Sequence, residues 1–110
     1  MQTDIVVQGE SKSFKVKVDT VYGPLDLGSY QSCGMYLYEN DNFSNVIMEW
    51  VSSDPTRAIF YSRPEGIIQF FIVNADTAAL EPNQYPYRMK ISKDAEHTYT
   101  VHEGILEIVA

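Results

Sequence analysis

Apolar and polar residues alternate along most of the chain, and turn residues interrupt the alternation about every ten positions. In Ser13–Asp19, for example, three apolar residues alternate with Lys15, Lys17 and Asp19. A period of two is typical of a strand that has one face in water and the other in a core. The pattern therefore predicts an all-β fold built from short strands.

The whole chain contains seven or eight segments of this kind, separated by turns rich in Gly, Pro, Asn and Asp. The expected strands are Asp4–Val7, Ser13–Asp19, Gln31–Tyr38, Asn45–Ser52, Thr56–Ser62, Ile67–Val73, Tyr85–Ser92 and His97–Val109. We expect them to pair antiparallel in two layers around one core, as in a β-sandwich. A length of 110 residues gives room for one domain, spanning residues 1–110.

The last of these strands changes its inward parity part of the way along. Tyr99 and Val101 share one parity, whereas Leu106 and Ile108 share the other. An inserted residue with glycine at the site is typical of a β-bulge, so the change predicts a bulge near Gly104.

One segment departs from the alternation and predicts a short helical turn. Asn74–Leu80 contains helix-favouring alanines, Leu80 can fill the core, and Pro82 ends the turn. The next strand then opens with Tyr85, whose phenol can reach back to the upstream backbone. This arrangement resembles the tyrosine corner that joins the two sheets of immunoglobulin-like domains.

Charge and composition narrow the classes of partner. The net charge is −7 and the sequence pI is about 4.6. Phosphate backbones and anionic membranes repel such a chain, so we expect neither nucleic acid nor membrane as partner. Met1–Val7 has no basic region followed by an apolar stretch, which predicts synthesis in the cytoplasm without the usual export signal.

The sequence offers few groups for catalysis or metal binding. Cys33 is the single cysteine and lies mid-strand among apolar residues, so we expect a buried structural thiol. His97 and His102 are the only histidines, and no further ligands stand at metal spacing. We therefore expect no catalytic residues, no cofactor and no metal, and we expect that the protein is not an enzyme.

Some strands carry apolar residues on both faces. If Ile68 and its parity partners point inward, then Ile67, Phe71 and Val73 point outward, and by the same reasoning Tyr36 and Tyr38 point outward. A second apolar face marks an interface with another protein, unless the flanking loops cover it. The five outward residues are the predicted partner-binding set.

The order of the motifs resembles small immunoglobulin-like domains of tailed-phage virion proteins, and it is most similar to the N-terminal domain of phage baseplate upper proteins. The similar segments are Gln8–Ser11, Phe14–Val18, Pro24–Gly28, Asp76–Pro82 and Tyr99–Val109. The resemblance implies a non-enzymatic structural protein of the virion, in the tail, baseplate or head. It implies binding to other virion proteins or to copies of itself.

A second class of function remains open. Outward aromatic rings such as Tyr36 and Tyr38 can stack on sugars, which would make the chain a carbohydrate-binding or adhesin module.

Overall fold

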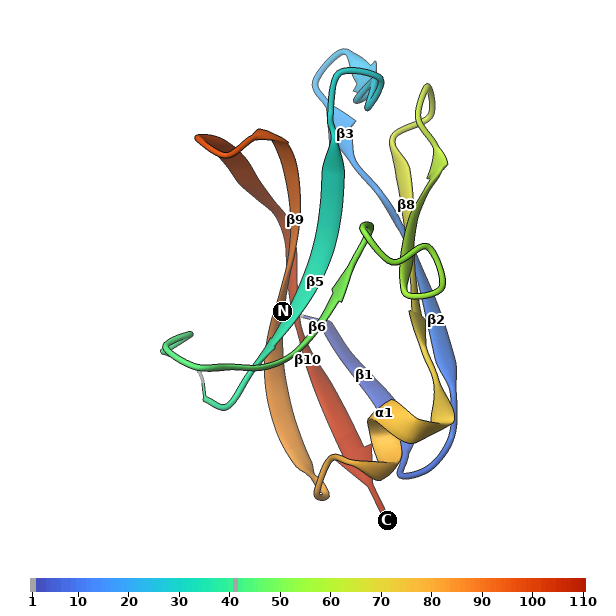
Figure 1. Cartoon of the computed structure of the whole chain (residues 1–110), viewed down its shortest axis with the longest axis vertical. Helices are drawn as coiled ribbons and strands as arrows, with labels where there is room; N and C mark the ends of the chain where they lie inside the picture. The colour runs from blue at the N-terminus through green and yellow to red at the C-terminus, as the bar shows by residue number, and fades with distance from the viewer. Residues whose placement is uncertain (1, 41) are drawn as a thin grey trace.

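The computed structural model describes residues 2–40 and 42–110 and confirms an all-β sandwich, with two layers of strands and one short helix at one end (Figure 1). Eight strands have five residues or more. They are β1 (Gln2–Val7), β2 (Lys12–Lys17), β5 (Ser32–Tyr38), β6 (Val46–Val51), β7 (Ala58–Ser62), β8 (Ile67–Ile72), β9 (Asn83–Asp94) and β10 (His97–Val109). Two-residue strands β3 (Asp19–Thr20) and β4 (Gly23–Pro24) form a small hairpin, and α1 is Asn74–Ala78.

The two layers are unequal in width. One sheet has five strands in the order β1-β10-β9-β5-β6, and the other has three in the order β2-β8-β7. Pairing is antiparallel with one exception, because β1 runs parallel to β10. The expectation of purely antiparallel strands is therefore wrong for β1. A hairpin forces its strands to be antiparallel, but β1 pairs with the last strand of the chain, so no turn fixes its direction.

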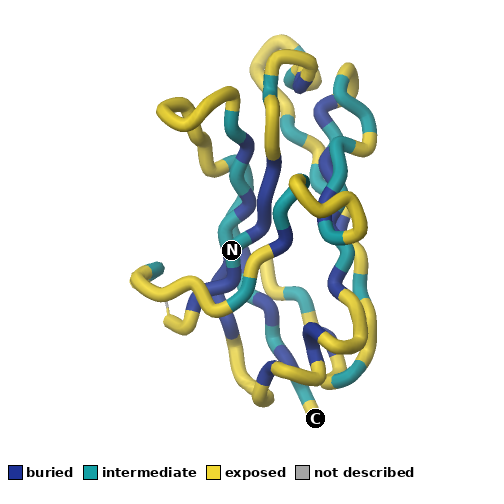
Figure 2. Tube along the Cα trace, viewed as in Figure 1, coloured by how far each residue is buried: buried dark blue, intermediate teal, exposed yellow. Residues whose placement is uncertain are grey.

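The core lies between the two sheets, where the predicted inward residues of β5 and β8 are buried (Figure 2). Tyr99 on β10 was also predicted to point inward, but it is 46% exposed. Cys33, Met35 and Leu37 on β5 and Ile68 and its parity partners on β8 face the core, as the alternation predicted. Their side chains exclude water from both layers, and this burial is the main stabilising contribution to the fold.

The segment around α1 matches the predicted tyrosine corner. The Tyr85 hydroxyl donates a hydrogen bond of 2.7 Å to the carbonyl of Glu81, four residues upstream. Leu80 is buried in the core, and the exposed Pro82 follows the helix before β9 begins. The corner thus joins the helical turn of one layer to the central strand of the other.

A buried carboxylate fixes α1 against both sheets. Asp76 accepts a hydrogen bond of 2.9 Å from the indole N–H of Trp50 and one of 3.0 Å from the backbone N–H of Val73. The guanidinium of Arg57 lies 3.4 Å from the other carboxylate oxygen. Since Trp50 is on β6 and Val73 follows β8, Asp76 connects the two layers.

The bulge in β10 lies at Val101, not at Gly104. The register with β9 shifts between Thr100 and His102, which leaves Val101 as the inserted residue. Gly104 instead pairs directly with Tyr87, and a Cβ at Gly104 would collide with the phenol of Tyr87. The parity change was a correct signal, but the glycine is required for the close approach of a ring.

Candidate functional site

Three of the five predicted partner-binding residues lie on or beside the outer face of the three-stranded sheet. Ile67 and Phe71 are half-buried on β8, and Val73, just after this strand, is 46% exposed. Their parity is as predicted, because Ile68, Phe70 and Ile72 take the inward positions.

The register of the sheet places lysines beside these apolar side chains. Lys17 pairs with Ile67, and Lys15 pairs with Gln69. The ammonium nitrogen of Lys15 lies 3.8 Å from the ring centroid of Tyr61 on β7. We name this surface the basic face, and it consists of Lys15, Lys17, Ile59, Tyr61, Ile67, Gln69 and Phe71.

The basic face stands out because the rest of the chain is acidic. Strands β2, β7 and β8 contain three lysines and no Asp or Glu, which gives them a charge of +3. The net charge of the whole chain is −7, so the remaining residues carry −10. A surface that joins aromatic and aliphatic side chains to this local charge complements an acidic partner.

The outer face of the five-stranded sheet is different, and the prediction for Tyr38 is wrong. Tyr38 is only 4% exposed, because its ring packs edge-to-face against Phe43 at a centroid distance of 5.1 Å. The guanidinium of Arg88 covers the other part of Phe43 at 3.6 Å from the ring centroid. The loop between β5 and β6 therefore folds back over Tyr38 and leaves it no surface for a partner.

Tyr36 is neither fully covered like Tyr38 nor as exposed as Val73. It is half-buried, and its ring lies across Gly34 of the same strand, where a side chain would come within about 3 Å of the ring atoms. Burial raises the pKa of its phenol above the ordinary value, and the nearby Glu49 acts in the same direction. Only part of Tyr36 remains accessible to a partner.

Sequence reasoning missed the most exposed apolar residues of the described part of the chain. Val21 is 93% and Tyr22 is 98% exposed at the tip of the β3–β4 hairpin. The hydroxyl of Thr20 donates to the carbonyl of Gly23 and accepts from the N–H of Tyr22, at 3.0 and 3.1 Å. Gly23 has φ of +114°, which glycine adopts without strain. Tyr22-Gly23-Pro24 signalled a turn, but nothing local indicated which side chains would project from it.

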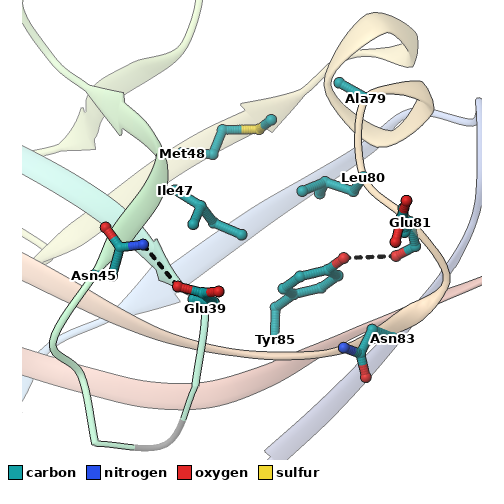
Figure 3. A pocket seen from close by; sticks show the side chains of 9 residues that line it. All are labelled: Glu39, Asn45, Ile47, Met48, Ala79, Leu80, Glu81, Asn83 and Tyr85. Carbon is teal, nitrogen blue, oxygen red and sulfur yellow. Dashed lines mark hydrogen bonds between the residues drawn. The ribbon is translucent and has the colours of Figure 1, made fainter.

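An open pocket lies near the end of the molecule that carries α1, beside the start of β6 (Figure 3). We name it the end pocket, and it has a volume of about 630 Å³. Its apolar residues include Ile47, Met48 and Leu80, and its polar residues include Glu39 and Glu81. The amide of Asn45 donates a hydrogen bond of 2.8 Å to the Glu39 carboxylate and so fixes its position. The end pocket therefore combines apolar surface with negative charge.

Cys33, His97 and His102 are the side chains that the sequence analysis considered for catalysis or metal binding. Burial raises the pKa of the Cys33 thiol to about 11, so it stays protonated near neutral pH. His97 is exposed and contacts Asp94 at 2.8 Å, and this hydrogen bond is the main reason that the pKa of Asp94 is lowered. His102 is on β10, and its Nε2 lies 3.4 Å from the hydroxyl of Tyr87 on the neighbouring strand β9. No group of three potential metal ligands occurs within residues 2–40 and 42–110.

No helix in the described residues is both long and apolar enough to cross a membrane.

Comparisons with known proteins do not identify a family for this chain. No family model and no curated protein matches the sequence. Among solved structures, the extracellular domains 3–5 of Drosophila OTK are similar to this chain with 16% identity and a TM-score of 0.39. The match covers 100% of this chain and 34% of that one, so the chain spans about a third of its length.

The topology itself defines the class of the protein. The protein is an immunoglobulin-like β-sandwich. Its two sheets face each other, β9 lies in the centre of one sheet between β5 and β10, Trp50 is buried, and Tyr85 forms the tyrosine corner. This class carries many unrelated functions, so function must be argued from the surfaces.

Proposed function

We propose that the protein is a non-enzymatic assembly protein of a tailed-phage virion, and that it binds a neighbouring protein through its basic face. The virion assignment rests on the order of sequence motifs from Gln8–Ser11 to Tyr99–Val109. The observation that carries the binding surface is the pair of exposed lysines on β2, Lys15 and Lys17, beside half-buried aromatic and aliphatic side chains.

The chemistry of the basic face favours an acidic protein as the partner. Tyr61 and Phe71 supply large rings of the kind that dominate interface energetics, and Lys15 already stacks on Tyr61. When a partner covers this face, the apolar stems of the lysines and the aromatic rings are buried together. The ammonium groups at the ends of the stems can then pair with carboxylates of the partner. Nucleic acid fits less well, because −10 charges on the remaining residues repel the phosphate backbone.

Purified particles from the phage that encodes the chain test this proposal. Mass spectrometry should find the wild-type protein in the particles. The double variant K15E/K17E should be lost from them, because both side chains are exposed and their reversal repels an acidic partner.

The matched control is K93E, which reverses an exposed lysine at the far end of β9. It changes the net charge of the chain but leaves the basic face intact, so it should enter particles normally. Particles without the wild-type protein would refute the virion role. Equal incorporation of K15E/K17E and the wild type would refute the basic face as the binding surface.

Carbohydrate binding is the second candidate function. The buried Tyr38 cannot stack on a sugar, but Tyr22, Tyr61 and Tyr99 expose 98%, 48% and 46% of their surface. Binding on a glycan array that is lost in Y22S would support this function. A broad array without binding would remove it.

A further inference from the structure

The end pocket selects an occupant that has both positive charge and apolar stems. Glu39 and Glu81 both line it, and no Lys or Arg is present among its described lining residues. Ile47, Met48 and Leu80 supply apolar surface in the same pocket (Figure 3). Lysine matches this combination, since its four-carbon stem packs on apolar surface while its ammonium group pairs with a carboxylate.

The basic face of the same chain provides the matching chemistry. Lys15 and Lys17 are exposed, and Tyr61 beside Lys15 is 48% exposed. No acidic residue lies in β2, β7 or β8, although Asp19, just after β2, lies 3.8 Å from the ammonium nitrogen of Lys17. Lys15 therefore offers the unpaired positive charge of these strands nearest to Tyr61.

We propose that the basic face of one copy docks on the end pocket of a second copy. This inference rests on the proposed assembly function and deepens it, because it names a second copy of the chain as a partner. Each contact joins two different surfaces, one that carries the two exposed lysines Lys15 and Lys17 and one that carries the carboxylates of Glu39 and Glu81. Contacts between different surfaces can repeat from copy to copy and produce rings or open chains.

Sedimentation velocity of the purified full chain tests the docking. We expect concentration-dependent association at about 50 mM salt that weakens at about 500 mM, because salt screens exposed charges. Two variants, K15E/K17E and E39K/E81K, should each weaken self-association by at least about tenfold, the change that about 1.4 kcal/mol produces. All four positions are exposed, so the variants should fold, and circular dichroism checks this.

Mixing the two variants is the decisive measurement. The intact basic face of E39K/E81K can dock on the intact end pocket of K15E/K17E, and the two reversed surfaces are also complementary. The mixture should therefore associate more strongly than either variant does alone. The control K93E should associate like the wild type, since it reverses a charge outside both surfaces.

The other outcomes overturn the inference in distinguishable ways. A wild-type chain that stays monomeric at all concentrations and salts refutes docking between copies. In that case loss of K15E/K17E from particles would leave the proposed function standing, with a different virion protein as the partner. A mixture of the two variants that fails to associate also refutes docking between copies. The same holds if the wild type does not self-associate but binds DNA or phosphatidylserine vesicles and loses this binding in K15E/K17E.

Discussion

Removing the carboxylate of Asp76 should destabilise the domain more than any exposed substitution, because three groups depend on it. In the variant D76A, the indole N–H of Trp50 loses its acceptor at 2.9 Å, and the N–H of Val73 loses its acceptor at 3.0 Å. The guanidinium of Arg57 loses a carboxylate at 3.4 Å. These three losses are unequal, and the exposure of each donor decides its size.

The largest loss comes from Trp50. Its side chain is fully buried, so water cannot replace the carboxylate, and a buried unsatisfied donor costs about 1–3 kcal/mol. Arg57 keeps the carbonyl of Glu49 as an acceptor at 3.0 Å and is 29% exposed, so its loss is about 1 kcal/mol or less. Val73 is 46% exposed, so water can replace the carboxylate as acceptor for its N–H, and the loss of this hydrogen bond costs about 0.5–1 kcal/mol.

Together these losses predict that D76A lowers the free energy of unfolding by about 1.5–5 kcal/mol, against the roughly 5–15 kcal/mol of a typical domain. Urea denaturation followed by Trp50 fluorescence measures the change directly. Asp54 provides the matched control, because it is exposed and, among the described residues, its side chain accepts hydrogen bonds only from Thr56, so D54A should lower the urea midpoint far less than D76A.

A double-mutant cycle with W50F isolates the indole–carboxylate hydrogen bond, and its coupling energy should be about 1–3 kcal/mol. Because W50F removes the single tryptophan, far-UV circular dichroism follows the unfolding of all four proteins of the cycle. The reasoning would be refuted if D76A unfolded within about 1 kcal/mol of the wild type, or if the cycle showed no coupling. Either result would mean that Asp76 does not tie α1 to β6.

Three further predictions concern other buried groups. Y85F should lower the free energy of unfolding by about 0.5–1.5 kcal/mol, because the hydrogen bond to the Glu81 carbonyl is lost; an unchanged urea midpoint would contradict this. G104A should cost about 1–3 kcal/mol, because its methyl group overlaps the ring of Tyr87, and a neutral result would show that the ring moves freely. Cys33 should resist Ellman's reagent at pH 8 in the folded chain, since its pKa is about 11 and it is 3% exposed, and should react once urea unfolds the protein. Rapid labelling without urea would count against a buried thiol.

Most of the strands were predictable because their signals are local. The alternation around Phe14 and around Phe70 predicted which residues face the core. Leu80 and Tyr85 predicted the tyrosine corner between the two layers. The direction of β1 was not predictable in this way. Its partner is separated from it by nearly the whole chain, and no turn between them sets the pairing.

The candidate site was predictable only in part, for a similar reason. Parity placed Ile67 and Phe71 outward and Lys15 and Lys17 on one side of their strand, but only the pairing of β2 with β8 brings the two sets together. The loop that covers Tyr38 gave no usable signal. It requires φ of +55° at Phe43, a conformation that the sequence does not favour for a bulky aromatic residue.

The lysines of β2 have a second physical role, which must be separated from docking. β2 is an edge strand, and charged side chains on an edge discourage pairing with a strand of another molecule. Protection of this kind depends on the presence of charge and hardly on its sign, so Lys15→Glu and Lys17→Glu preserve it. Docking on an acidic surface depends on the sign itself. If the lysines only protect the edge, K15E/K17E will enter particles and sediment like the wild type. If they take part in assembly, reversing their charge must abolish binding while the chain stays folded.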